Sequence, residues 1–441
     1  MKNFLFRGFA CALLPFAISS TLSAASDRSQ HSLPSGLTSL DQSSVLAQLA
    51  ELSASDGTRK NQLGLSVATS GNTVVVGAPG ANDGHNQGAG AVYVFTKPAN
   101  GWANEAQMAK LTCANGSTPI ACGSSVAISG NTIVTNGADP VLVQNVALVF
   151  VEPTGGWRNM TQTAELTVTD QGSFDGGFNA LAISGNTIVA GTELSSVFGS
   201  QQGEAYVYVE PANGWANMTQ TAILFPPQGQ KDYNFGSSVA LSGNVAVIGA
   251  SNANNDAGGA YVFVEPAGGW VDMSQTAELS ASDGAAFSSF GVSVAISDTT
   301  IVVGASAATI GSHQAQGAAY VYVEPEGGWQ NMTETAKLTT STGGTGNLFG
   351  ASVSASGNAV LVGAPNVKIG ANTAEGAAYV FEKPSTGWVN TAQPAAKFSA
   401  GTKGSSFGAS VVMSGATAVV GAPTGVSGGT KNTGAAYVFG P

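Results

Sequence analysis

Residues 349–388 read FGASVSASGNAVLVGAPNVKIGANTAEGAAYVFEKPSTGW, and variants of this stretch recur along the chain. The stretch holds three apolar runs, which are separated by a Ser-Gly-Asn turn and by a polar loop and are followed by a Gly-Trp corner. Short runs rich in Val, Ile, Tyr and Phe between Gly, Asn and Pro signals predict β-strands. The repeat period is nearly constant, because the corner tryptophans follow one another at spacings of 55, 58, 55, 59 and 59 residues: Trp102, Trp157, Trp215, Trp270, Trp329 and Trp388.

A fourth run completes each unit, as in Thr-Ala-Glu-Leu-Thr at residues 163–167. Seven such units predict an all-β fold, a seven-bladed β-propeller of four-stranded blades, because radial repetition buries both faces of every blade against its neighbours. A linear β-solenoid is an alternative, although it needs capping ends and usually has shorter repeats. A β-sandwich would not explain seven copies.

The two ends of the repeat array predict how the ring closes. The seventh unit runs to Phe439 and lacks the Trp corner and the fourth strand, whereas residues 50–57 (AELSASDG) repeat residues 277–284 letter for letter. We therefore expect the N-terminal strand to complete the last blade. An open array would leave two unpaired strand edges, which invite aggregation, and a ring removes both.

The motifs that open and close the strands point to a known repeat. Phe-Gly pairs open units at residues 235, 290, 349 and 407, and Gly-Ala-Pro ends second strands at residues 77–79, 363–365 and 421–423. This pattern resembles the FG-GAP repeat, the unit of the propeller of integrin α subunits and of many secreted bacterial proteins. The resemblance covers residues 45–441 and implies a binding or adhesion role. Three copies are degenerate: the first opens with Leu63-Gly64, the second opens with Cys122-Gly123, and the third ends Ala190-Gly191-Thr192.

The first-to-second connections depart from the integrin type, which carries spaced aspartates there for calcium. In this chain they are tight turns at residues 70–72, 129–131, 184–186, 242–244, 297–299, 356–358 and 414–416, and Asp298 is the one carboxylate among them. Calcium takes six to eight oxygen ligands, several of them carboxylates. We therefore expect no metal site, no cofactor and no dependence on calcium.

Composition excludes several functional classes. The 441 residues include 59 glycines and only 9% charged residues, where a typical soluble domain carries about 25%, which argues against a helical bundle. Fifteen Lys and Arg against 26 Asp and Glu give a net charge of −11, so nucleic acid is not an expected partner. Three histidines and three cysteines are too few for the usual zinc sites.

The N-terminus has the parts of a secretory signal over residues 1–24: Lys2 and Arg7, an apolar stretch too short for a membrane span, and small residues before the expected cleavage point. Residues 25–44 read as a polar lead-in, and the propeller as residues 45–441. We expect a periplasmic, secreted or cell-surface protein without membrane insertion. Cys113 and Cys122, the pair left after cleavage, predict a disulfide in such a compartment, and two free buried thiols are the alternative.

The tryptophans allow two interpretations. Each is followed at the second position by an Asn or Asp, and a residue that recurs in every copy usually serves the repeat itself. We interpret the indoles as corner packing and the Asn or Asp side chains as caps of that corner. The alternative is that the indoles form platforms for sugars. The six Asn or Asp positions are Asn104, Asn159, Asn217, Asp272, Asn331 and Asn390.

No catalytic residues are expected. A Ser-His-Asp triad would have to use His85 or His313, and neither lies in a nucleophile motif. A glycosidase needs two carboxylates about 5–10 Å apart, whereas the acids here are sparse and several recur at repeat positions. An enzyme acting on extracellular polysaccharide, a lyase or a hydrolase, remains the alternative.

Function is expected on the loops. In a propeller the second-to-third and fourth-to-first connections emerge on one face, and the sequence varies most in the second-to-third set at residues 79–90, 251–259, 306–317, 365–376 and 423–434. Loops on a rigid scaffold often carry binding residues, and amides suit sugar hydroxyls or a peptide backbone. We hypothesise a ligand surface formed by Asn82, Asp83, His85, Asn86, Asn254, Asn255, Asp256, His313 and Gln314.

The sequence thus predicts a secreted, monomeric, non-catalytic binding propeller whose partner is an extracellular protein or glycan. A purely structural surface protein, with loops that are only solvated, is the third possibility.

Overall fold

The computed structural model describes residues 46–83, 87–113, 121–139, 144–169, 178–193, 202–226, 233–370, 374–400, 404–427, 430–431 and 433–441. The expected signal segment and the expected lead-in both lie outside these residues.

The described residues form a seven-bladed β-propeller, whose blades are numbered here by the order of their innermost strands. Tight turns at the Ser-Gly-Asn sites join each innermost strand to an antiparallel second strand. The innermost strands are β2 (Ser66–Ser70), β7 (Val126–Ser129), β12 (Ala180–Ser184), β17 (Phe235–Ser242), β22 (Phe290–Ser297), β27 (Ser352–Ser356) and β31 (Ser410–Ser414). The second strands are β3 (Thr73–Ala78), β8 (Thr132–Asp139), β13 (Thr187–Thr192), β18 (Val245–Ala250), β23 (Thr300–Ala305), β28 (Ala359–Ala364) and β32 (Thr417–Ala422).

Two further antiparallel strands complete each blade. The third strands are β4 (Ala91–Thr96), β9 (Gln144–Val151), β14 (Glu204–Val209), β19 (Gly259–Val264), β24 (Ala318–Val323), β29 (Ala377–Glu382) and β35 (Ala435–Gly440). The fourth are β6 (Ala109–Thr112), β11 (Ala164–Thr167), β16 (Ala222–Phe225), β21 (Ala277–Ser280), β26 (Ala336–Leu338), β30 (Ala396–Phe398) and, in blade 7, β1 (Ala47–Ser53). Two second-to-third connections hold small elements of their own, α1 (Ala253–Asp256) in blade 4 and the pair β33 (Val426–Ser427) and β34 (Thr430–Lys431) in blade 7.

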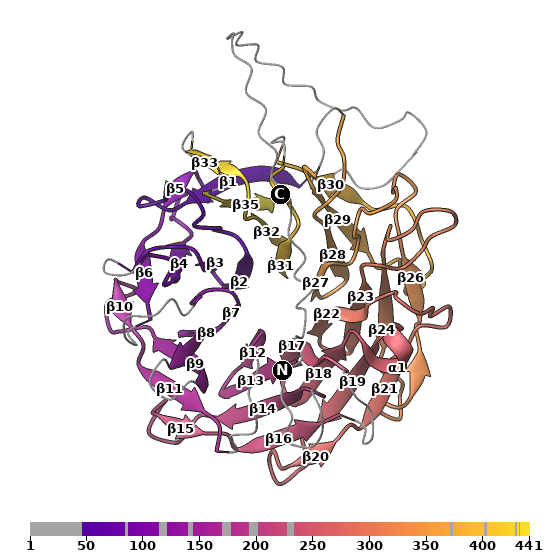
Figure 1. The fold of residues 1–441 in the computed structure, drawn as a ribbon, viewed down its shortest axis with the longest axis horizontal. Helices are drawn as coiled ribbons and strands as arrows, with labels where there is room; N and C mark the ends of the chain where they lie inside the picture. The colour runs from indigo at the N-terminus through magenta and orange to yellow at the C-terminus, as the bar shows by residue number, and fades with distance from the viewer. Residues whose placement is uncertain are drawn as a thin grey trace, which may run out of the picture. The chain divides into compact units, whose positions relative to one another are not determined.

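The first and last repeats lie side by side. Strand β1 pairs antiparallel with β35, with Glu51 opposite Tyr437 and Leu52 opposite Ala436, and Figure 1 shows the indigo β1 beside the yellow β35. The innermost strands contact one another in blade order, and β31 of blade 7 contacts β2 of blade 1. The seven sheets therefore follow one another around a closed ring.

The expectation of four strands per blade is incomplete. In five blades a two-residue fifth strand from the next repeat pairs parallel with the fourth strand, because the chain passes that outer edge after each Trp corner. These fifth strands cover backbone groups that would otherwise form an open edge. They are β5 (Glu105–Ala106), β10 (Met160–Thr161), β15 (Met218–Thr219), β20 (Met273–Ser274) and β25 (Met332–Thr333).

The hydrophobic core is divided among the blade interfaces. Among the described residues, buried side chains form seven clusters, and each cluster draws on two neighbouring blades. Val247 of blade 4 and Val303 of blade 5 belong to one cluster, for example, and Val76 of blade 1 and Val438 of blade 7 belong to another. Each blade is therefore stabilised mainly by its two neighbours.

Glycines set the spacing between blades. A Cβ on Gly77, in the Gly-Ala-Pro of blade 1, would lie 2.0 Å from the carbonyl oxygen of Gly123, in the opening of blade 2. Ser66 Oγ donates to that same oxygen at 2.8 Å. The equivalent contact between Gly421 of blade 7 and Gly64 of blade 1 closes the ring. Three further interfaces combine the glycine contact with this serine bond, through Ser238, Ser293 and Ser352.

The interface between blades 2 and 3 is built differently. Asn136 stands where the other second strands have this glycine, and Asn179 follows Phe178 where other blades have Phe-Gly. A side chain supplies the bond between the blades instead, because Ser125 Oγ of blade 2 accepts from the Leu181 N–H of blade 3 at 3.1 Å. Within blade 2, Asn136 Oδ1 accepts from the Ser125 N–H at 3.0 Å. The two asparagines thus mark an interface without the glycine contact.

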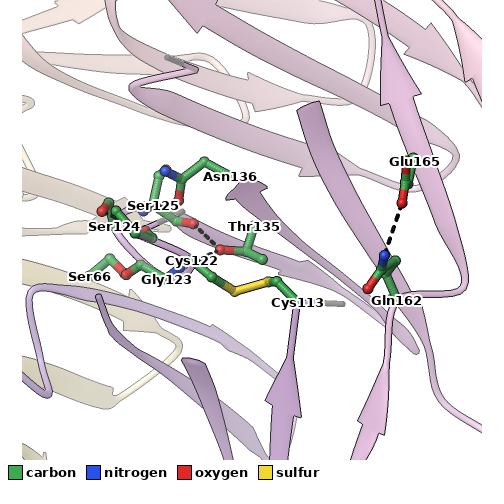
Figure 2. Close-up of a disulfide and its surroundings, with 11 residues drawn as sticks. Ser66, Cys113, Cys122, Gly123, Ser124, Ser125, Thr135, Asn136, Gln162 and Glu165 are labelled. Carbon is green, nitrogen blue, oxygen red and sulfur yellow. Dashed lines mark hydrogen bonds between the residues drawn. A yellow bond between two sulfur atoms is a disulfide. The ribbon is translucent and has the colours of Figure 1, made fainter. Parts of the chain in front are cut away.

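The predicted disulfide between Cys113 and Cys122 is confirmed, and the alternative of two free thiols is wrong. Figure 2 shows it joining the segment after β6 of blade 1 to the opening of blade 2, near Thr135 and Ser125. Cys122 occupies the position that phenylalanine takes in other repeats. The bond therefore links blades 1 and 2 covalently.

The contribution of β1 can be measured. Leu52 is fully buried in the cluster between blades 7 and 1, so Leu52→Ala should lower the free energy of unfolding by about 2–5 kcal/mol. Gln48→Ala, at an exposed position of the same strand, should change it by less than about 0.5 kcal/mol. Urea unfolding followed by tryptophan fluorescence measures both. Equal effects of the two substitutions would contradict a structural role for β1.

Candidate functional site

A cavity of 730 Å³ opens at the junction of the first and last blades. Its walls come from the connection between β1 and β2, from the second-to-third loop of blade 1 and from the start of the same loop in blade 7. The described lining residues are Thr58, Arg59, Lys60, Gln62, Gly80, Asn82, Gln87, Gly88, Pro423 and Thr424. The cavity therefore brings together both kinds of connection that emerge on the loop face.

Hydrogen bonds and a close backbone contact hold the β1–β2 connection in place. The amide of Asn61, only 1% exposed, lies 2.7 Å from the Thr58 hydroxyl, and the Asn61 carbonyl accepts from the Gly80 N–H at 3.1 Å. A Cβ on Gly80 would lie 1.9 Å from the Lys60 carbonyl oxygen, so only glycine allows this approach. Arg59, Lys60 and Gln62 are left exposed at the cavity.

Lys60 has an unusual backbone conformation. Its φ is +76°, in the left-handed region that glycine adopts readily and other residues adopt at a cost. Gly346 (φ +78°) and Gly404 (φ +70°) occupy the same place, three residues before the Phe of their repeats, and Phe287 (φ +64°) occupies it before blade 5. Phe287 is 72% exposed. Two copies thus place a large side chain at a position suited to glycine.

The predicted ligand residues do not form one site. Asn82 lines the cavity, and its Oδ1 accepts from the Gly88 N–H at 3.2 Å. Asp83 is half-buried and is not among the described lining residues. His85 and Asn86 lie outside the described residues.

The other predicted residues belong to blades 4 and 5. Asn254, Asn255 and Asp256 lie in α1, where Asn254 Nδ2 donates to Glu278 Oε1 at 3.3 Å and the Asp256 carbonyl accepts from the Phe287 N–H at 2.7 Å. His313 closes a small turn with Ile310 in blade 5, and the Gln314 carbonyl accepts from the Gly346 N–H at 2.9 Å. Blades 2 and 3 stand between this region and Asn82 on one side of the ring, and blades 6 and 7 on the other.

Sequence reasoning missed Arg59, Lys60 and Gln62, because it compared only the second-to-third loops. Aligning SDGTRKNQLG (residues 55–64) with SDGAAFSSFG (residues 282–291) shows Arg59 and Lys60 opposite Ala286 and Phe287. A comparison of the fourth-to-first connections would therefore have identified these side chains from the sequence.

An ionic cluster next to the cavity joins blade 7 to blade 1. Lys110 Nζ donates to Asp56 Oδ2 and to the Asn82 carbonyl, both at 2.5 Å, and the Tyr93 hydroxyl donates to Asp56 Oδ1 at 2.9 Å. Asp283, Tyr320 and Lys337 repeat this arrangement between blades 4 and 5.

The carboxylates of both clusters are held in the charged form. Burial acts to raise the pKa of Asp283, but the hydrogen bonds from Lys337 and Tyr320 outweigh it and hold the pKa below its usual value. The pKa of Asp56 is lowered in the same way by Lys110 and Tyr93. Lys397 lies over Tyr379 in blade 6 as Lys337 lies over Tyr320, but Thr342 replaces the aspartate there.

The Trp corners serve the fold. Five of the six indoles are buried, with 5–6% exposure, and Trp102 is partly buried, so the interpretation as packing is confirmed for the five. The predicted role of the following Asn or Asp is wrong in detail, because the side chain does not cap its own corner. In every copy its Oδ1 accepts from a backbone N–H in the fourth strand of the preceding blade, since the chain passes that strand directly after the corner.

The FG-GAP repeat profile matches residues 46–95, 218–263, 273–322, 332–381 and 395–439, more than half of the chain. The chain belongs to the FG-GAP repeat family. No curated protein matches its sequence. The unmatched stretch between residues 95 and 218 contains Asn136 and Asn179, the two positions at which this FG-GAP propeller departs from the glycine contact.

The described part of this FG-GAP chain holds no group of three or more His, Cys, Asp and Glu side chains arranged to bind a metal ion. None of its described helices has the length and apolar character needed to cross a membrane.

The ionic clusters predict a pH dependence. A carboxylate whose pKa is lowered by folding stabilises the protein above its unfolded pKa of about 3.9 and loses that effect as pH falls through the folded value. Asp283→Asn should therefore lower the free energy of unfolding at pH 7, by less than about 1 kcal/mol because the side chain is half-exposed. The difference from the unmodified protein should shrink as the pH falls through the folded pKa of Asp283.

Asp298→Asn provides the control, since Asp298 is exposed in the turn between β22 and β23. Denaturant unfolding at several pH values measures both variants. A deficit in Asp283→Asn that stays constant down to pH 2 would rule out the carboxylate as its cause.

Proposed function

We propose that this FG-GAP propeller is a secreted, non-catalytic binding module of the adhesion type, which presents its loop face to an extracellular protein or glycan. The observation that carries the proposal is the cavity between blades 7 and 1, whose volume of 730 Å³ lies within the range of ligand sites, about 300–1,000 Å³. The family to which the chain belongs is consistent with a ligand-binding domain.

The construction of the loop face supports binding. The β1–β2 connection is fixed by the buried Asn61 and by the contact with Gly80, so its exposed side chains project from a rigid support. Preorganised side chains lose little entropy when a ligand binds, which favours affinity. The hydrogen bonds from Phe287 to Asp256 and from Gly346 to Gln314 give blades 4 and 5 the same kind of support.

A non-catalytic role is supported by how the polar groups are used. The carboxylates with lowered pKa, Asp56 and Asp283, are engaged by lysine and tyrosine and connect neighbouring blades. His313 lies exposed, and its described hydrogen bonds are backbone contacts with Ile310. The disulfide is consistent with an oxidising compartment outside the cytoplasm. We also propose a monomer, which would leave the loop face free to bind a partner.

The proposal predicts binding by the purified mature chain, residues 25–441, on glycan and protein arrays, with equal signals in the presence and absence of a calcium chelator. A loop-face variant, Asn82→Ala combined with Gln87→Ala, should weaken that binding at least fivefold. Asn131→Ser combined with Asn358→Ser, in the exposed turns of the opposite face, should leave it unchanged. Binding that needs calcium, or turnover of a polysaccharide in place of binding, would contradict the proposal.

A further inference from the structure

The cavity between blades 7 and 1 differs from the rest of the protein in its charge. The chain carries a net charge of −11, yet the described lining of the cavity contains Arg59 and Lys60 and no carboxylate. Asp56, in the β1–β2 connection, is paired with Lys110, so neither of these two residues adds net charge, and Asp83, which follows the lining residue Asn82, is half-buried and not among the described lining residues. We propose that this cavity binds the anionic group, carboxylate or sulfate, of an acidic polysaccharide; the inference rests on the proposed binding function.

The backbone conformation of Lys60 supports a functional role for its side chain. Two equivalent positions in the repeat, Gly346 and Gly404, are glycine with nearly the same φ, so the backbone requires no side chain here. A lysine in the left-handed region costs free energy that a glycine would not. The adjacent Arg59 corresponds to Ala286 in the connection between blades 4 and 5, which shares the SDG sequence. Lys60 is thus an addition to a scaffold that two other copies build with glycine, whereas the Arg59 position also holds a lysine in two other copies, Lys231 and Lys403.

The remaining lining fits a sugar better than a protein side chain. Thr58, Gln62, Asn82, Gln87 and Thr424 offer hydroxyl and amide groups, and Pro423 is the one large apolar side chain among the described lining residues. Protein partners are usually anchored by aromatic or other apolar side chains in dry pockets. Arginine can bind a carboxylate or sulfate through two parallel hydrogen bonds, and lysine adds a point charge. The sugar hydroxyls next to the bound anionic group would then contact the amide side chains that line the cavity.

The test measures binding of the purified mature chain to immobilised polygalacturonate, dextran sulfate, neutral dextran and poly-glutamate by biolayer interferometry at two salt concentrations. We expect binding to one or both acidic polysaccharides that weakens as salt rises, and no binding to dextran. The two acidic polysaccharides distinguish carboxylate from sulfate. The variant Arg59→Ala/Lys60→Gly introduces the residues that the repeat itself uses at these positions, so it should fold normally and bind at least tenfold more weakly.

Two variants serve as matched controls. Phe287→Gly makes the same backbone change at the equivalent position of another repeat and should not alter binding to the acidic polysaccharide. Lys97→Ala/Arg158→Ala removes two exposed positive charges elsewhere and should change binding less than twofold.

The outcomes separate this inference from the proposed function. Tight binding of poly-glutamate with none of either polysaccharide would overturn the assignment to a sugar. Array binding to neutral glycans that persists in Arg59→Ala/Lys60→Gly would overturn the inference and leave the binding function standing. The absence of any ligand on the arrays would overturn both.

Discussion

The close contact between glycines of neighbouring blades is the constraint on which the ring depends. Gly77 and Gly123 approach so closely that neither could carry a side chain, and the serine bond to the Gly123 carbonyl fixes their relative position. The same contact recurs around the ring and includes Gly421 with Gly64, where the last blade meets the first. Since each hydrophobic cluster lies between two blades, this spacing also decides how well the core packs.

Outside the glycines, six of the seven blade interfaces are also connected through the outer parts of the blades. The Asn or Asp after each Trp corner accepts a hydrogen bond from the fourth strand of the preceding blade, as Asn331 does from Glu278. The Asp56 and Asp283 clusters add ionic contacts at two interfaces, and the disulfide adds a covalent one between blades 1 and 2. Blades 2 and 3 have asparagines in place of the contacting glycines, and the Ser125 Oγ of blade 2 accepts a hydrogen bond from the Leu181 N–H of blade 3.

Much of the architecture could be predicted from the sequence, because repeated segments show which parts of the chain form equivalent strands even when they are far apart. The identity of residues 50–57 with residues 277–284 indicated a fourth strand without its own blade, and β1 pairs with β35. The fifth strands could not be predicted, since a two-residue segment such as Met332–Thr333 has no periodicity of its own and pairs only because the neighbouring edge is there. For the same reason, the hydrogen-bond partner of Asn331 could not be predicted from the sequence.

The candidate site was predictable only in part. Asn82 was identified from the variability and polarity of its loop, but the predicted residues of blades 4 and 5 belong to another region of the ring. Arg59 and Lys60 follow the strand that completes the last blade, so their position beside Thr424 depends on ring closure. A cavity made of segments from both ends of the chain is not a local property of either segment.

The pairing of β1 with β35 also determines the order in which the molecule can fold. Strand β1 precedes the other strands of the propeller in the sequence and pairs with β35, which follows them all, so blades 1 to 6 can form before blade 7 is complete. Closing so long a loop is slow relative to local hairpins, and the unpaired strands remain open to wrong partners until then. Folding of the propeller therefore finishes with a single late step, and the cavity between blades 7 and 1 exists only in chains that have completed it.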